Sequence, residues 1–236
     1  MLSWRSYWTD NPKLFMKVME KSTQFFAQKL IKSKLITGNT RLLDFGCGPG
    51  YLATQLKDRI ALYYGVDISE KYIKTAREKC ADIADFYFLE LPEDRSPEGL
   101  KTIGLPKEGF DIVIILSVIQ YFQNKEEVLV LLQNCKSFIH ASGKIILADV
   151  IENDKGLWKD AVNVLKHSLS NFYVGSFIRF IFRIKFSKYN RLRKIHKLLY
   201  LTEADVNNLC RELQMQYAIL PHLTIHSSRV SYCLTL

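Results

Sequence analysis

The chain has 236 residues, of which 48% are hydrophobic and 24% are charged, and its formal net charge is +9. The length fits one large domain better than two, and such a domain buries a full apolar core without disulfides. No apolar run follows the N-terminus, as a secretory signal would require, and the longest apolar-looking stretch, 172–186, is too short and too charged to span a bilayer.

The five cysteines are scattered along the chain, and no two of them form a CxxC pair. They are Cys47, Cys80, Cys135, Cys210 and Cys233. This spacing signals neither a zinc site nor a disulfide framework. We therefore expect no bound metal and reduced thiols, as in a cytoplasmic protein.

Apolar segments alternate with helical patterns along the first two thirds of the chain. Strands are predicted at 42–45, 61–68, 85–89, 110–118 and 144–150. Helices are predicted at 51–57, from an N-cap at Ser69 to about residue 81, and from an N-cap at Asn124 to a C-terminal Gly143. This alternation predicts an α/β fold, a doubly wound and mostly parallel sheet with helices on both faces.

The end of the chain has a different pattern. The segment "TEAD" at 202–205 resembles a capping box and begins a helix that extends to about residue 214. The segments "YAILP" (217–221) and "VSYCLTL" (230–236) predict two further strands with a short connection. A short connection implies a hairpin, so one of these strands is expected to be antiparallel.

A glycine-rich loop follows the first predicted strand, in the segment "LLDFGCGPG" at 42–50. Ligands of doubly wound sheets bind beyond the carboxyl ends of the strands, and glycines there allow a ligand to approach the backbone closely. The spacing GxGxG, with no GK[ST], excludes a P-loop and differs from the dinucleotide pattern GxGxxG. Asp67, at the end of the second strand, places a carboxylate where a ribose is bound.

Four segments in this order resemble the class I S-adenosylmethionine-dependent methyltransferases of the small-molecule type: "LLDFGCGPG", "GVDIS", "FDIVIILSVIQYF" and "SGKIILADV". The resemblance covers about residues 40–150 and resumes at "LTEADVNNLCRELQMQ" and in the terminal hairpin. It implies a seven-stranded Rossmann-like sheet with an antiparallel last strand. It also implies that S-adenosylmethionine is the methyl donor and S-adenosylhomocysteine the product.

The resemblance assigns cofactor contacts to particular positions. Asp44 would face the ammonium group, the glycines would pass close to the methionine part, Asp67 would bind the ribose and Ile68 would pack on the adenine. Glu90 falls near the position of an acid for the adenine amino group. The implied cofactor-binding residues are Asp44, Gly46, Cys47, Gly48, Gly50, Asp67, Ile68, Glu90, Leu91 and Ser117. Simpler interpretations are turn glycines, Cys47 as a small space-filler, a core Ile68 and a solvated Glu90.

Many small-molecule members of the family carry histidine where this chain has Tyr121. A tyrosine hydroxyl is a poor base near neutral pH, so we expect Tyr121 to position the acceptor, or alternatively to pack under the next helix. The segment before the first strand often forms a lid in this family. Tyr7 and Trp8 are therefore candidate substrate contacts, with plain packing as the alternative.

The whole charge excess lies in one segment. Residues 161–202 contain nine Lys or Arg and no Asp or Glu. Five polar residues recur at helical spacing and predict one face of an amphipathic helix: Ser176, Arg179, Arg183, Ser187 and Asn190. Arg179 and Arg183 are candidate substrate contacts. Such a helix suits an anionic membrane surface, a phosphorylated or carrier-linked acceptor, or a solvated cap.

The prediction is a single domain with four parts: an N-terminal helical lid (1–39), a cofactor-binding core (40–150), a basic helical cap (151–201), and the last helix with the hairpin (202–236). We expect a methyltransferase acting on a small-molecule or lipid-like, anionic acceptor, located in the cytoplasm and in contact with a membrane surface in the lipid version. The alternatives are an RNA or protein methyltransferase and a non-catalytic partner subunit. RNA is disfavoured because no appended RNA-binding motif and no "NPPY"-type loop is present.

Overall fold

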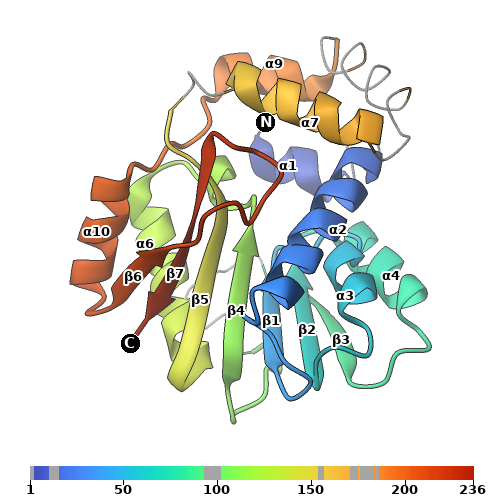
Figure 1. Ribbon diagram of the computed structural model, residues 1–236, viewed down its shortest axis with the longest axis vertical. Helices are drawn as coiled ribbons and strands as arrows, with labels where there is room; N and C mark the ends of the chain where they lie inside the picture. The colour runs from blue at the N-terminus through green and yellow to red at the C-terminus, as the bar shows by residue number, and fades with distance from the viewer. Residues whose placement is uncertain are drawn as a thin grey trace.

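A computed structural model describes residues 3–10, 16–92, 102–153, 157–170, 175, 183 and 186–236. Its centre is a seven-stranded sheet in the order β3-β2-β1-β4-β5-β7-β6 (Figure 1). The strands are β1 Arg41–Phe45, β2 Leu62–Asp67, β3 Phe86–Glu90, β4 Phe110–Leu116, β5 Ile139–Ile151, β6 Gln216–Ile219 and β7 Arg229–Thr235. Neighbours among β1 to β5 pair in parallel, and β7 is antiparallel to both β5 and β6. The predicted fold class is confirmed.

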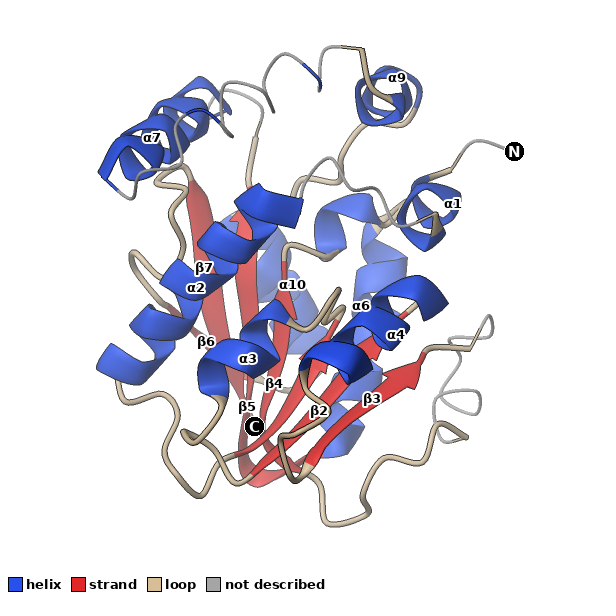
Figure 2. Cartoon of the chain, turned by 90° about the vertical axis from the view of Figure 1, so that its right-hand side faces the viewer, coloured by secondary structure: helices blue, strands red, loops and turns tan. Residues whose placement is uncertain are grey.

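The helices form two layers and a cap. They are α1 Trp4–Thr9, α2 Met16–Lys32, α3 Tyr51–Leu56, α4 Glu70–Lys79, α6 Lys125–Phe138, α7 Leu157–Ser170, α9 Lys188–Ile195 and α10 Glu203–Glu212, with a 3-10 turn η2 at Ile119–Tyr121. Helices α2, α3 and α4 cover one face of the sheet, and α6 and α10 cover the other (Figures 1 and 2). Helices α1, α7 and α9 lie beyond the carboxyl ends of the parallel strands.

Alternation along the strands explains the two layers. Leu42 of β1 belongs to a buried cluster with Phe26 of α2 and Leu52 of α3. The next residue, Leu43, belongs to a second cluster with Val128 of α6. Successive side chains of a strand point to opposite faces, so a continuous apolar run fills both layers. This arrangement leaves the carboxyl ends of the strands as the place for polar chemistry.

Three predicted helix starts are confirmed by side-chain caps. Ser69 accepts a hydrogen bond from the backbone of Tyr72, Asn124 accepts one from Glu127, and Thr202 forms a reciprocal capping box with Asp205. The predicted helix end at Gly143 is wrong, because α6 ends at Phe138 and Gly143 lies inside β5.

The continuous amphipathic helix predicted through residue 190 is also wrong. Ser187 has an extended backbone (φ −80°, ψ 160°) and caps α9, which begins at Lys188. Ser187 and Asn190 therefore lie at the start of a separate helix. Ser176 and Arg179 lie outside the described residues. Among the helices that the structure describes, none has the length and apolar character needed to cross a bilayer.

Candidate active site

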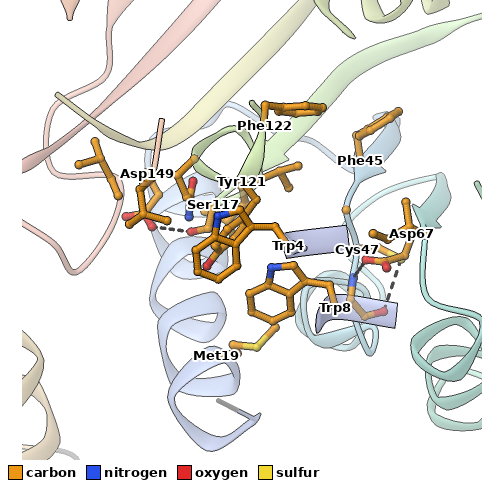
Figure 3. Close-up of a pocket in the computed structure, with 18 of the residues that line it drawn as sticks. Trp4, Trp8, Met19, Phe45, Cys47, Asp67, Ser117, Tyr121, Phe122 and Asp149 are labelled. Carbon is orange, nitrogen blue, oxygen red and sulfur yellow. Dashed lines mark hydrogen bonds between the residues drawn. The ribbon is translucent and has the colours of Figure 1, made fainter. Parts of the chain in front are cut away.

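A cavity of about 1490 Å³ opens at the carboxyl ends of β1, β2, β4 and β5, beneath α1 and α9 (Figure 3). Pockets for a single drug-sized ligand usually measure roughly 300–1,000 Å³. The cavity therefore has room for a cofactor and a second molecule. Asp67 lies at one side of the close-up and Asp149 at the other, with Tyr121 and Trp4 between them (Figure 3).

The glycine loop is fixed to β2 by its backbone. Gly46 and Cys47 both donate to the carbonyl of Val66, at 2.8 and 3.0 Å. Gly48 has a φ of +53°, and among the described residues a Cβ added there would meet the Met19 Cε alone, at 3.6 Å. The backbone of Gly48 therefore faces open space in the cavity, as close approach of a ligand requires.

Gly50 has a different role from the one predicted. It caps α3 with a φ of +76°, and an added Cβ would lie 2.9 Å from the Cβ of Ala76 on α4. Gly50 is not among the described residues that line the cavity. It allows α3 and α4 to pack closely, while Gly46, Cys47 and Gly48 form the cavity wall.

The carboxylate of Asp67 ties the end of β2 to the loop. One oxygen accepts a hydrogen bond from the backbone of Gly48 and the other from the backbone of Ser69, each at 2.9 Å. A carboxylate accepts about four hydrogen bonds, so these two are compatible with further bonds to ligand hydroxyls. The nearby hydroxyl of Tyr72 lines the cavity and is buried without a hydrogen-bond partner in the described part of the chain. These polar atoms fit a ribose.

Asp44 is a buried acid in the floor of the cavity. It is 3% exposed, and the hydroxyl of Tyr63 donates to it at 2.5 Å. Burial raises the pKa of Asp44 to about 7; the hydrogen bond from Tyr63 opposes the rise, and the charge of Asp67 adds to it. A cation in the cavity would favour the ionised form. The position of Asp44 thus fits an ammonium group.

The remaining predicted cofactor contacts divide into two groups. Ile68, Leu91 and Ser117 line the cavity, whereas Glu90 is exposed and is not among its described lining residues. The proposed contact between Glu90 and the adenine is thus without support in the geometry. Cys47 is buried, and burial raises the pKa of its thiol well above the ordinary value, which fits a space-filling role rather than a nucleophile.

Aromatic rings separate the two ends of the cavity. Tyr121, on η2, lies 5.1 Å from the ring of Trp4 and 5.0 Å from that of Trp8, measured between ring centroids. Burial raises the pKa of the Tyr121 hydroxyl well above its ordinary value. Tyr189 raises this pKa further, through its charge and through its hydrogen bond with Tyr121. Trp8 lines the cavity and stays a candidate substrate contact. Tyr7 does not: it is buried, with its ring centroid 5.2 Å from that of Trp8.

The basic residues at the cavity differ from those predicted. Arg193 of α9 and Lys197, two residues beyond its end, are lining residues. Arg183 is exposed and is not among the described lining residues, and Arg179 lies outside the described residues. Among the described basic residues of the cap, the structure therefore places Arg193 and Lys197 at the cavity and does not place Arg183 there.

Sequence reasoning missed a polar cluster beside Ser117. Asp149, at the carboxyl end of β5, accepts hydrogen bonds from Ser117 and from His226, the latter at 2.7 Å. Arg229, the first residue of β7, donates to Asp149 at 2.6 Å and to Asp160 of α7 at 3.0 Å. The one available signal was an acid at the end of the fifth strand, in "KIILADV".

Comparison with known proteins identifies the fold. The family model described as "Methyltransferase domain" matches residues 36–181, which is more than half of the chain. The chain belongs to this methyltransferase family. The prediction that the chain is a class I S-adenosylmethionine-dependent methyltransferase is thereby confirmed.

Curated relatives of this methyltransferase match only in part. It is 23% identical over 127 residues to the ubiquinone biosynthesis O-methyltransferase of Coxiella burnetii, covering 54% of this chain and 50% of that enzyme. The chain spans half or less of the length of the first curated relatives that it matches.

Solved structures show the same fold at low identity. Magnesium protoporphyrin IX methyltransferase (ChlM) from Synechocystis PCC 6803 with bound SAH has a TM-score of 0.53 and 20% identity, covering 88% of this chain and 78% of that one. A putative methyltransferase in complex with the Haloferax volcanii Trm112 methyltransferase activator has a TM-score of 0.61 and 14% identity, covering 100% and 98%.

Proposed function

We propose that this methyltransferase transfers the methyl group of S-adenosylmethionine to a small-molecule or lipid-like acceptor that carries an anionic group. The observation that carries the proposal is one deep cavity with two chemically different ends. The end at β1 and β2 presents Asp44, Asp67 and the open backbone of Gly48. The other end is aromatic and carries charges of both signs, with Trp4, Tyr121, Arg193 and Asp149 among its lining residues.

Methyl transfer needs little machinery from the protein. The sulfonium of S-adenosylmethionine supplies an electrophilic methyl group and leaves as a neutral thioether. The residues of this chain hold the donor through Asp44 and Asp67 and keep water out with the rings of Trp4, Trp8 and Tyr121. Their main contribution is orientation, which by itself lowers a barrier by several kcal/mol, on the order of 7–11 in the best model systems.

Two basic residues that line the cavity, Arg193 and Lys197, support an anionic acceptor. Arg193 is half-buried at the cavity, Lys197 is exposed beside it, and no Asp or Glu lies between residues 161 and 202. A phosphorylated, carboxylated or carrier-linked acceptor would be attracted there. Ile195 of α9 and Phe186 just before this helix are 65% and 80% exposed, which also suits an acceptor presented at an anionic lipid surface.

The enclosed geometry favours a small acceptor over RNA or a folded protein. A tethered macromolecule would have to extrude one group past α1 and α9 into the cavity. The test has two stages on the full chain. Calorimetry is expected to show binding of S-adenosylmethionine and S-adenosylhomocysteine, and a radiolabelled methyl-transfer screen is expected to label anionic small molecules or lipids. Exclusive labelling of RNA or protein substrates would overturn the proposed acceptor class.

A further inference from the structure

The polar cluster at the end of β5 has no role in cofactor binding as described above. Asp149, Asp160, His226 and Arg229 all line the cavity. Asp149 lies at the side opposite to Asp67 (Figure 3), His226 and Arg229 bond to it directly, and Asp160 is linked to it through Arg229. Figure 3 shows Asp149 bonded to Ser117, at the tip of β4. The cluster therefore faces the part of the cavity assigned to the acceptor.

An irregular backbone conformation directs the side chain of Asp149 toward the cavity. The pairing of β5 with β7 shifts register between Leu147 and Val150, and Asp149 has a φ of +67°. Irregularities of this kind redirect a side chain and are common beside active sites. Ser117, its hydrogen-bond donor, also has a positive φ, of +56°.

Asp149 is held in its ionised form. Its side chain is 2% exposed, and burial alone would raise its pKa. The nearby guanidinium of Arg229 and the hydrogen bonds from His226 and Ser117 outweigh burial, and together they lower the pKa of Asp149 below its ordinary value. An ionised carboxylate only accepts hydrogen bonds, so the Nδ1 of His226 donates in their 2.7 Å contact.

This contact fixes the tautomer of His226. With the proton on Nδ1, the neutral ring carries a lone pair on Nε2. Nε2 makes no hydrogen bond within the described part of the chain, and the imidazole, whose side chain is 15% exposed, lines the cavity. The basic nitrogen is therefore available to a molecule in the acceptor part of the cavity.

Arg229 and Ser228 hold the two acids of the cluster in place. Asp149 and Asp160 carry two negative charges, and Arg229 between them carries one positive charge. Asp160 is also held by the backbone and hydroxyl of Ser228, at 3.2 and 2.6 Å. Asp149, which orients the imidazole of His226, is therefore itself fixed by a network of hydrogen bonds.

We propose that His226 is the general base of the methyl transfer and that Asp149 is its positioning residue, so the acceptor is a hydroxyl or amine that must lose a proton. In the hydroxyl case, the acceptor oxygen forms a bond to the methyl carbon while the carbon–sulfur bond breaks. The oxygen's proton passes to Nε2 of His226, and S-adenosylhomocysteine is left as the neutral thioether. This inference rests on the proposed function.

Asparagine tests the base because its side-chain amide keeps a donor near the position of Nδ1 but has no basic nitrogen. His222→Asn is the matched control, since His222 is an exposed residue in the same connection between β6 and β7. The probe acceptors are phenol and 4-nitrophenol at pH 8, where the latter is already ionised. With phenol, His226→Asn is expected to lower the single-turnover rate by about 10²–10⁴-fold, the usual contribution of a general base. With 4-nitrophenol, the loss is expected to stay under about tenfold, because no proton has to be removed.

A second readout does not depend on turnover. In ¹⁵N spectra of the histidine-labelled chain bound to S-adenosylhomocysteine, the His226 signals, assigned by their loss in His226→Asn, are expected to show a protonated Nδ1 and a bare Nε2. In Asp149→Asn the opposite tautomer is expected, because an amide donor would face Nδ1. An Nε2-protonated ring in the wild type overturns the proposal, as does an equal loss of rate with both phenols.

The outcomes separate the two proposals. If the wild type labels no small molecule or lipid in the methyl-transfer screen, the proposed acceptor class is contradicted. The tautomer of His226 in the ¹⁵N spectra then tests the pairing of His226 with Asp149 by itself. Normal turnover of phenol by both the wild type and His226→Asn overturns the dyad, and labelling of anionic molecules in the screen decides the acceptor class separately. In that case the cluster is an ion-pair network that joins β5, β7 and α7.

Discussion

The carboxylate of Asp67 accepts a hydrogen bond from the backbone N–H of Gly48 at 2.9 Å, across 19 residues of sequence. The end of β2 and the glycine loop are thus one structural unit. Asp67, which is proposed to bind the ribose of the cofactor, also fixes the glycine loop, which is proposed to lie against the methionine part of the cofactor. Substitution at this position is therefore expected to disturb both halves of cofactor binding.

Asp67→Ala is expected to weaken binding of S-adenosylhomocysteine by roughly 1–3 kcal/mol, the scale of a lost buried hydrogen bond. Calorimetry measures the change directly. Asp67→Asn keeps an acceptor oxygen and is expected to lose less. An Asp67→Ala variant that folds normally and binds as tightly as the wild type would contradict the placement of the ribose.

Asp44 makes the stability and the cofactor affinity depend on pH in opposite directions. Its pKa of about 7 in the folded chain lies above the ordinary value of 3.8. The folded chain without cofactor therefore holds this proton more tightly than the unfolded chain, and stability falls as the pH rises from about 4 to about 7. The ammonium group of the cofactor needs the ionised acid, so binding is expected to release a proton.

Affinity for S-adenosylhomocysteine is accordingly expected to fall below pH 7, by at most about tenfold per pH unit. Calorimetry at pH 6 in two buffers of different ionisation enthalpy counts the released proton. Asp44→Asn is the control, because the amide cannot titrate. Equal proton release by Asp44→Asn and the wild type would show that another group is responsible.

Gly48 and Gly50 are expected to fail in different ways when replaced by alanine. At Gly50 the new Cβ would meet Ala76 at 2.9 Å, so Gly50→Ala is expected to destabilise the fold by about 1–3 kcal/mol, as overpacking does. At Gly48 the new Cβ finds only Met19 at 3.6 Å and projects toward the cofactor. Gly48→Ala is expected to lower cofactor affinity more than stability.

Thermal unfolding and calorimetry on the same two variants separate these effects. Gly104→Ala is the matched control, since Gly104 also has a positive φ, of +76°, and no described atom lies within 4 Å of its added Cβ. Losses of the same kind in Gly48→Ala and Gly50→Ala would mean that the loop glycines act as one packing unit.

Local signals were the reliable part of the sequence. The caps at Ser69, Asn124 and Thr202 were predictable because each depends on residues within one helical turn. The end of α6 was not, because Gly143 lies inside β5, which pairs with β4 from Lys144 onward. A neighbouring strand decides this conformation, and short-range patterns do not contain that information.

The sequence marks residues that line the cavity at its β1 and β2 end, but not those at the other end. Asp44, Gly48 and Asp67 are marked by a compact motif and by strand ends. Asp149 and Arg229 are 80 residues apart in the sequence, and only the antiparallel placement of β7 beside β5 brings them together. Tyr7 was misassigned because an aromatic residue near a lid has the same sequence pattern whether it packs or binds.

Tyr121 is expected to position the acceptor without accepting its proton. Tyr121→Phe keeps the ring contacts with Trp4 and Trp8 and removes the hydroxyl that bonds to Tyr189. Cofactor affinity is expected to remain unchanged, and turnover to fall only modestly. Turnover assays with calorimetry decide this, and a rate loss beyond about 10⁴-fold would indicate that Tyr121 acts as a base.

The basic residues Arg193 and Lys197 at the cavity are expected to select the acceptor. Arg193→Ala combined with Lys197→Ala should weaken capture of an anionic acceptor and leave S-adenosylhomocysteine binding intact, because both side chains lie with α9 and its end rather than with β1 and β2. The effect should shrink as the salt concentration rises, since exposed charges are screened beyond about 10 Å at 0.1 M.

Co-sedimentation with vesicles containing anionic lipid tests whether the acceptor is presented at a lipid surface. Lys71→Ala combined with Lys74→Ala on α4 is the control of equal charge. If both double variants match the wild type in vesicle binding and in turnover of anionic acceptors at every salt concentration, the segment is a solvated cap and the acceptor is recognised by the aromatic rings alone.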